Sequence, residues 1–108
     1  MADIVIEDFK KVELVVGKVL EVEEVAGADK LFLVTVDLGA EVRKVVAGIK
    51  PWYQMEELKG KSVIVVANLA PRTIRGVESK GMLLASRSGE TLSIVTLDRE
   101  LPPGSPVS

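Results

Sequence analysis

The sequence predicts an all-β fold, because short valine-rich segments separated by turn residues recur along its 108 residues. The first segment, 12–25, places apolar side chains at alternate positions, as expected of a long strand with one buried face. Gly17 in its middle predicts a bulge or a bend. After a turn at 27–30, the second segment, 32–38, alternates in the same way. These two segments predict the first hairpin of a sheet.

The rest of the chain continues the pattern, with one helix interposed. Pro51 is suited to the first turn of a short helix over residues 52–59, which Gly60 would end. A basic loop with two glycines occupies 68–81, and three prolines in the last eight residues predict an extended tail. The later strands are expected at residues 42–49, 62–67, 82–86 and 91–97.

This order of elements is that of an OB-fold five-stranded barrel, in which the first strand is long and one short helix lies between strands 3 and 4. An SH3-like barrel lacks a helix in that place. The sixth strand and the proline-rich end then form a C-terminal extension. OB barrels bind oligonucleotides across strands 2 and 3 and with the loops joining strands 1–2 and 4–5, here residues 27–30 and 68–81. The fold alone does not establish function.

The composition disfavours catalysis and metal binding. The sequence has no Cys and no His, which excludes disulfides and thiolate zinc sites and removes the commonest acid–base side chain. Residues 60–62 resemble the end of a phosphate-binding P-loop, but Met55 stands where that motif needs Gly. We therefore expect no enzymatic activity and no cofactor. The acidic N-terminus and the absence of a long apolar run lead us to expect a cytoplasmic protein without membrane contact.

The small net charge of −2 conceals a division along the chain. Residues 1–41 carry ten acids and four bases, and residues 88–108 carry three acids and one base. Residues 42–87 between them carry nine bases and three acids. Such a division can place a basic face on an acidic body, as a protein that meets a polyanion requires. The alternative is that these are solvated surface charges with no partner.

Four motifs together resemble the tRNA-binding domain family. They are Asn68 to Met82, read as NLxPRxxxGxxSxGM, with ADKL at 28–31, VDLG at 36–39 and EELKGK at 56–61. The resemblance runs from about Phe9 to Ser86. The family includes the C-terminal domain or β subunit of methionyl-tRNA synthetases, free-standing structure-specific tRNA-binding proteins and cytokine-like synthetase-associated polypeptides.

The resemblance implies one tRNA-binding OB-fold domain over 1–108, with the barrel at about 9–86. Its members are usually homodimers that grip the outer corner of tRNA and read shape, without chemistry of their own. They assist an associated synthetase, here methionyl-tRNA synthetase, and the extension 87–108 is implied in dimerisation. The RNA-facing residues that the resemblance implies are Lys30, Arg43, Lys44, Asn68, Arg72, Arg75, Ser79, Lys80 and Met82.

Several of these residues have a second interpretation. Arg72 and Arg75 could offer planar donors to phosphate oxygens or could be solvated loop residues. Ser79 could donate to phosphate or to a ribose hydroxyl, and could equally cap a turn. Met82 begins an apolar run, so we expect core packing unless the barrel exposes it.

The shortage of aromatic residues favours a folded RNA over a single strand. Phe32 shares its parity with buried valines, and we expect Trp52 and Tyr53 to pack at the helix, so no base-stacking surface is predicted. The alternative function is an export-chaperone-like interaction module that binds peptides, with Ile74, Met82 and residues 4–6 lining the groove. Steep salt dependence is expected only of the RNA-binding alternative.

Overall fold

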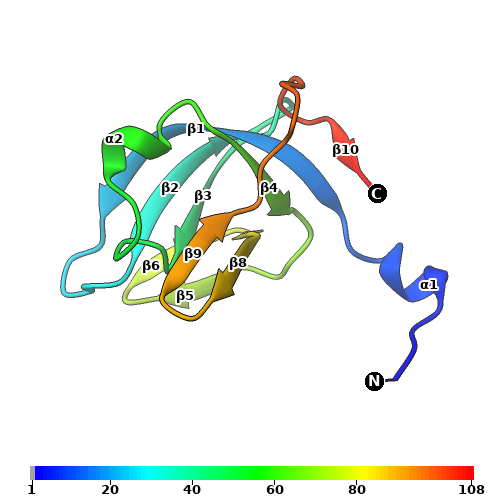
Figure 1. Ribbon diagram of the computed structural model, residues 1–108, viewed down its shortest axis with the longest axis horizontal. Helices are drawn as coiled ribbons and strands as arrows, with labels where there is room; N and C mark the ends of the chain where they lie inside the picture. Colours follow the sequence, from blue (N-terminus) through cyan, green and yellow to red (C-terminus); the bar gives the residue numbers. More distant parts are fainter. Residues whose placement is uncertain (1) are drawn as a thin grey trace.

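The computed structural model describes residues 2–108 and confirms the predicted all-β barrel. One curved antiparallel sheet has the strand order β3-β2-β1-β4-β7, and β10 also pairs with β1 (Figure 1). The strands of this sheet are β1 (Leu14–Glu24), β2 (Phe32–Asp37), β3 (Val42–Ala47), β4 (Ser62–Val66), β7 (Met82–Leu83) and β10 (Pro106–Val107).

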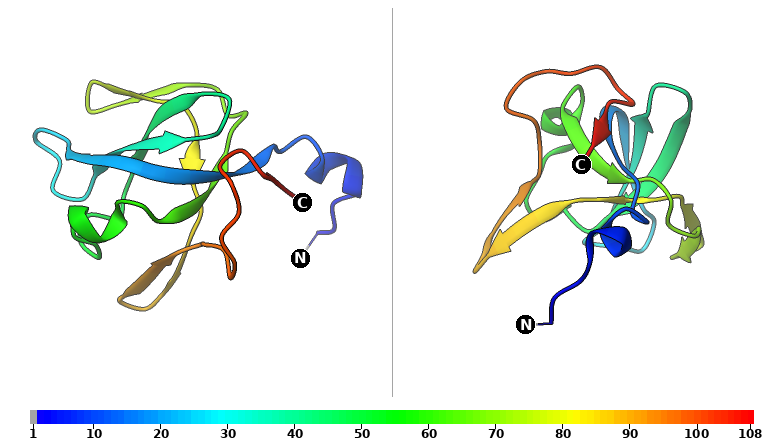
Figure 2. Two further views of the ribbon diagram at one scale, coloured as in Figure 1. Left: turned by 90° about the horizontal axis from the view of Figure 1, so that it is seen from above. Right: turned by 90° about the vertical axis from the view of Figure 1, so that its right-hand side faces the viewer.

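The sheet curls until its two end strands, β3 and β7, lie close together (Figure 2). The amide of Lys80 donates to the carbonyl oxygen of Lys44 at 3.1 Å, which joins the segment before β7 to β3. A second link comes from β6 (Val77–Ser79), which also contacts β3. The barrel is therefore closed on the side where the predicted binding residues lie.

The core follows from the alternation that the sequence predicts. Along β2 every second residue is buried, beginning with Phe32, and the buried valines of β3 and β4 complete the interior. A Cβ atom on Gly17 would lie 2.3 Å from Val36 Cγ1, so only glycine lets β1 pass this close to β2. The bulge in β1 falls later, between Val19 and Glu21. Gly17 thus provides close packing, while the register shift lies elsewhere.

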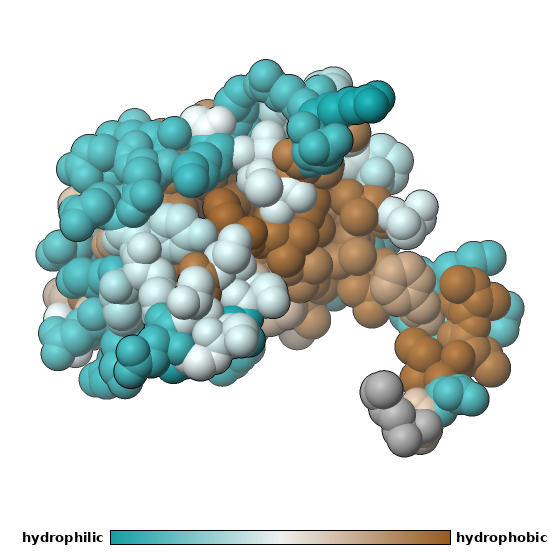
Figure 3. Space-filling model, viewed as in Figure 1, coloured by the Kyte–Doolittle hydropathy of each residue, from teal (hydrophilic) through white to brown (hydrophobic). Residues whose placement is uncertain are grey.

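The helix between β3 and β4 is shorter than expected. α2 covers only Met55–Leu58, because a capping box between Gln54 and Glu57 starts the helix there and Pro51 lies in a preceding turn. The structure adds a further short helix, α1 (Ile6–Phe9), on a segment that projects from the barrel (Figure 1). Figure 3 shows apolar surface on this projecting segment, where Ile4 is exposed. Among residues 2–108 no helix is long and apolar enough to cross a membrane.

Two expectations for the second half of the chain are corrected. The loop predicted at 68–81 contains a hairpin of two three-residue strands, β5 (Arg72–Ile74) and β6. The strand expected at 82–86 divides, because the chain leaves the barrel after β7 and enters a second hairpin. That hairpin pairs β8 (Ala85–Ser88) with β9 (Thr91–Ile94).

The proline-rich end is attached to the barrel, where an extended tail was expected. The amide of Gly104 donates to Val16 O at 2.7 Å, and the amide of Val16 donates to Ser105 O at 2.9 Å. β10 then continues along the first residues of β1. A Cβ atom on Gly104 would lie 2.6 Å from Leu38 O, so this segment approaches the end of β2 as closely as a glycine permits.

Candidate nucleic-acid interface

The β5–β6 hairpin carries the predicted arginines. Ile74 pairs with Val77, so only Arg75 and Gly76 form its turn. Both residues have positive φ, 52° and 78°, as a two-residue turn that matches strand twist requires. Glycine adopts this conformation freely, whereas a residue with a Cβ atom is strained by about 1 kcal/mol or more. The hairpin therefore holds a cation at its tip at some cost in stability.

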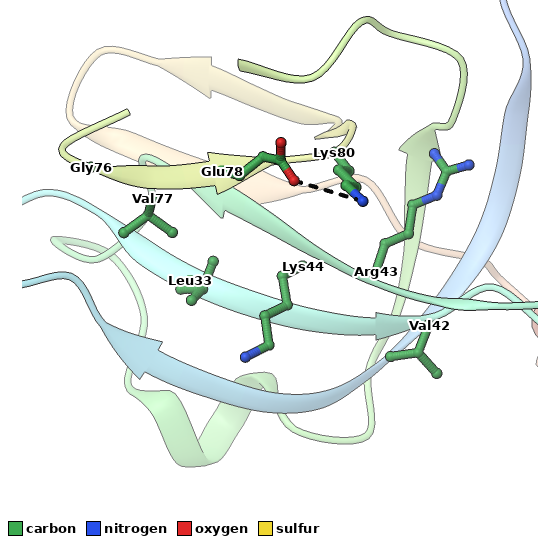
Figure 4. A pocket seen from close by; sticks show the side chains of 8 residues that line it. All are labelled: Leu33, Val42, Arg43, Lys44, Gly76, Val77, Glu78 and Lys80. Atoms are coloured by element: carbon green, nitrogen blue, oxygen red, sulfur yellow. Dashed lines mark ion pairs between the residues drawn. The ribbon is translucent and has the colours of Figure 1, made fainter. Parts of the chain in front are cut away.

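A groove of about 510 Å³ separates this hairpin from the outer face of β2 and β3 (Figure 4). Lys44 pairs with Glu23 at 3.7 Å, and Lys80 pairs with Glu78 at 3.6 Å. Such exposed ion pairs contribute little stability, so both lysines can exchange their carboxylate for a phosphate at small cost. The residues lining the groove are Leu33, Val42, Arg43, Lys44, Gly76, Val77, Glu78 and Lys80.

A second hollow, of about 390 Å³, lies where the two predicted binding loops meet. Residues 27–31 line one side and Arg75 lines the other. Lys30 and Arg75, 45 positions apart in the sequence numbering, thus border the same space. Within residues 2–108, neither they nor Arg72 form an ion pair shorter than 4.0 Å. These three cations are available to an anionic ligand.

Ser79 and Asn68 hold the two ends of the hairpin segment. The Ser79 side chain is buried, and its hydroxyl accepts from the amide of Val46 at 2.9 Å and donates to Gly81 O at 3.2 Å. Asn68 Oδ1 accepts from the amide of Glu13 at 2.9 Å, and its Nδ2 donates to Lys11 O at 2.6 Å. Of the two roles considered for Ser79, the geometry favours the internal one.

Arg43 is also engaged inside the protein. Its Nε and Nη2 donate to the two carboxylate oxygens of Glu41 at 2.6 and 3.2 Å, and its Nη1 donates to Ala67 O. The hydrogen bond from Arg43 lowers the pKa of Glu41, and the positive charges of Arg43 and Lys80 lower it further. The same bond raises the pKa of Arg43. Sequence reasoning missed Glu41, which lies two positions before Arg43 and directly ahead of β3. In an extended chain that spacing brings two side chains to the same side.

The remaining predicted residue, Met82, is 45% exposed and borders a small hollow with Leu69 and Ile74. The aromatic residues lie elsewhere: Phe32 is in the core, and Trp52 is covered by the guanidinium of Arg87, 4.8 Å from the ring centroid. The groove lining contains no aromatic side chain among the described residues. The interface therefore offers charge and shape, with no base-stacking surface.

Comparison with known proteins establishes the family. A family model described as "Putative tRNA binding domain" matches residues 14–106. The chain belongs to the tRNA-binding domain family. It is 52% identical over 105 residues to a methionine–tRNA ligase of Thermotoga maritima, and 54% identical over 101 residues to one of Pyrococcus horikoshii. These matches cover 97% and 94% of the chain but only 17% and 14% of the two ligases.

Solved structures agree with this assignment. A MetRS-related protein of Pyrococcus horikoshii superposes with a TM-score of 0.94 at 35% identity, covering all of both chains. The chaperone CsaA of Bacillus anthracis superposes with a TM-score of 0.90 at 26% identity, covering 99% of this chain and all of that one. Membership of the tRNA-binding domain family makes this chain a non-catalytic binding domain.

Proposed function

We propose that this tRNA-binding domain binds the outer corner of folded tRNA through the exposed cations of the β5–β6 hairpin and the 27–31 loop. The observation that carries the proposal is that Lys30 and Arg75 border one hollow, on the two loops that OB barrels use for oligonucleotides. Arg72 lies on the same hairpin as Arg75, and none of the three has an ion-pair partner among residues 2–108. Lys44 and Lys80 extend this surface along the groove, and Met82 borders the small hollow that Arg72 also lines. Phosphate contacts of this kind position a nucleic acid without reading its sequence.

The names of the relatives point to the partner. We propose that the domain assists methionyl-tRNA synthetase, either as a β subunit or in trans, in the cytoplasm where tRNA is charged. Holding tRNA beside the synthetase raises its effective concentration at the active site without any new catalytic contact. The proposal also takes residues 1–108 as one domain that forms homodimers through its 87–108 extension.

Binding of unfractionated tRNA over a range of salt concentrations tests the proposal. The controls are single-stranded DNA and an unfolded RNA of equal length. We expect folded tRNA to bind tighter than both, with an affinity that falls steeply as salt rises, because each phosphate contact releases counterions. Equal affinity for tRNA and for the controls would contradict recognition of the folded molecule.

The CsaA structures support a second candidate, the binding of peptides in protein export. Two such chaperones superpose with TM-scores of 0.90, and the chain exposes the apolar side chains of Ile4, Val5 and Met82. A peptide held by apolar contacts would keep its affinity as salt rises, whereas tRNA would not. The same titration with an unfolded apolar peptide therefore separates the two candidates.

A further inference from the structure

Arg43 lines the groove, but its surroundings differ from those of Lys44 and Lys80, the two exposed lysines of the groove. Three nitrogens of the Arg43 guanidinium are already donating, two to Glu41 and one to Ala67 O. Of the five N–H groups that arginine carries, two remain. The Arg43 side chain is only 22% exposed, whereas those of Lys44 and Lys80 are 58% and 55% exposed.

The charge of Arg43 is also balanced locally. A carboxylate bound by two parallel hydrogen bonds neutralises the guanidinium at close range, so the pair attracts a distant phosphate weakly. For Arg43 to bind phosphate it would have to leave both Glu41 and Ala67, and the carbonyl oxygen of Ala67 would then lose its donor. Figure 4 shows Arg43 beside the end of β4, pointing away from Lys44 and Val42.

The hydrogen bond from Arg43 to Ala67 O connects β3 to the segment that leads into the β5–β6 hairpin. Ala67 follows β4 directly, and its amide donates to Glu13 O at 2.8 Å while its carbonyl oxygen accepts from Arg43. Asn68 is then clamped to the segment before β1. Four residues after Asn68 the chain enters β5 at Arg72. Arg43 thus fixes the direction in which the chain leaves the barrel for the hairpin.

The other end of the hairpin is fixed independently. Ser79 and Lys80 bond to Val46 and Lys44 of β3, so β3 holds both the entry and the exit of the hairpin. A hairpin held at both ends presents Arg72 and Arg75 in one orientation. Without Arg43 the entry would keep its bonds to the segment before β1 but lose its bond to β3. The hairpin would then sample more orientations relative to β3, and the ordering cost would fall on binding.

We propose that Glu41 and Arg43 form a brace that positions the β5–β6 hairpin for tRNA, and that Arg43 is a positioning residue that does not contact the RNA. This inference rests on the proposed function and narrows the set of residues that touch RNA. Glu41 then supports tRNA binding indirectly, by holding Arg43 in place, although its own negative charge would repel a phosphate.

The test compares Arg43→Gln and Glu41→Gln with the native protein by two measurements. One is tRNA affinity over a range of salt concentrations, and the other is amide hydrogen exchange of residues 72–79. Arg43→Lys is the second variant, since it keeps the charge but cannot make the same set of three hydrogen bonds. Arg72→Ala serves as the phosphate-contact control. Glu78→Gln is the matched control for Glu41→Gln, because each removes a carboxylate that is paired with a basic residue of the groove. Circular dichroism establishes that each variant is folded.

We expect Arg43→Gln and Glu41→Gln each to weaken tRNA binding about fivefold, to leave the salt slope unchanged and to speed exchange in residues 72–79. Arg72→Ala should reduce the salt slope by about one unit. Glu78→Gln should bind tRNA as well as the native protein or better, because it removes an anion that repels phosphate and frees Lys80 from its ion pair.

Either of two results in a single variant would overturn the brace. One is an Arg43→Gln salt slope reduced as in Arg72→Ala, and the other is a Glu41→Gln affinity raised as much as in Glu78→Gln. Unchanged affinity and exchange in both variants would overturn it as well. Failure of the proposed function is distinguishable, because the native protein would then show no preference for tRNA, while the exchange rates, measured without RNA, would still report on the hairpin.

Discussion

The two hairpins that leave the barrel, β5–β6 and β8–β9, are similar in construction but differ in what becomes of their arginines. Both have a two-residue turn that contains a glycine at positive φ, Gly76 in the first and Gly89 in the second. In the first hairpin Arg75 occupies the turn and forms no ion pair within the described chain. In the second, Arg87 lies over the ring of Trp52, and its Nε donates to Gly89 O at 3.1 Å.

The difference shows that the neighbours of an arginine decide whether it is available to a ligand. Trp52 also donates its indole N–H to Glu90 O at 2.8 Å, so the β8–β9 turn is held against the α2 region. Nothing comparable covers the tip of β5–β6 among the described residues. One hairpin uses its cation to stabilise the fold, and the other presents it to solvent at the cost of backbone strain.

The largest expected effect comes from removing the exposed arginines. Arg72→Ala with Arg75→Ala should weaken tRNA binding about 30-fold, because two charged contacts of about 1 kcal/mol each are lost. The salt slope should fall by about two units, and every tRNA species should be affected alike. Filter binding with several purified tRNAs measures both quantities. Loss of affinity for a single species would indicate base reading and contradict the proposal.

Arg75→Asn should separate stability from binding at the turn. Asparagine tolerates positive φ better than arginine, and Asn-Gly is a preferred sequence for this turn. We expect the free energy of unfolding to rise by about 1 kcal/mol and Tm by about 4 °C, while tRNA affinity falls about fivefold. Arg72→Asn is the control, since Arg72 lies in a strand and should bring no gain in stability. An unchanged Tm would show that the turn stores no strain.

Arg87→Ala should lower the stability of the fold and leave tRNA binding unchanged. Loss of the contact with Trp52 should lower the free energy of unfolding by about 0.5 kcal/mol, the value of an exposed cation–π pair. Affinity for tRNA and its salt dependence should stay unchanged, because Arg87 is engaged with its own hairpin. Urea unfolding and tRNA titration test this together. A reduced salt slope would show that the β8–β9 hairpin also contacts tRNA, and the two hairpins would then not differ in the role of their arginines.

The smallest expected effect concerns acid. Arg43 holds the pKa of Glu41 below its ordinary value, so the pair contributes its full stability above about pH 4.3, the usual glutamate pKa, and loses it as pH falls through the lower folded value. The Tm difference between the native protein and Glu41→Gln should therefore be constant near neutral pH and vanish in stronger acid. A difference that persisted in acid would show that the carboxylate charge does not stabilise the fold.

Much of the barrel could be predicted because its strands are long enough to show alternation. The hairpin at 72–79 could not be predicted, because strands of three residues are too short to show alternation of apolar and polar side chains. Arg-Gly is also not one of the preferred sequences for a two-residue turn. The strand expected at 82–86 was divided by tertiary contacts: the amide of Leu84 donates to Ile64 O, and the amide of Val95 donates to Leu84 O. The three prolines near the end predict an extended tail. The structure differs because Gly104 and Ser105 form hydrogen bonds with Val16 of β1, a partner that the local sequence does not indicate.

The members of the candidate site stay a prediction, and their hydrogen-bond partners could not be predicted from the sequence. The resemblance supplied the residues, and the structure divides them by partners that lie far away in the sequence. Asn68 bonds to the segment before β1 across 55 positions, and Ser79 bonds to Val46 across 33. A single sequence does not reveal such partners, so an exposed cation such as Arg72 and an internally bonded one such as Arg43 look alike in it.

The pairing of β10 with the start of β1 has a consequence for synthesis on the ribosome. β1 emerges from the ribosome before Pro106 and Val107, which pair with Val15 and Leu14, have been made. At ordinary translation rates the interval is on the order of ten seconds. Throughout it, this edge of β1 has unpaired amides and carbonyls of the kind that attract other chains. The start of β1 is therefore open to pairing with other chains until residues 106 and 107 have been made.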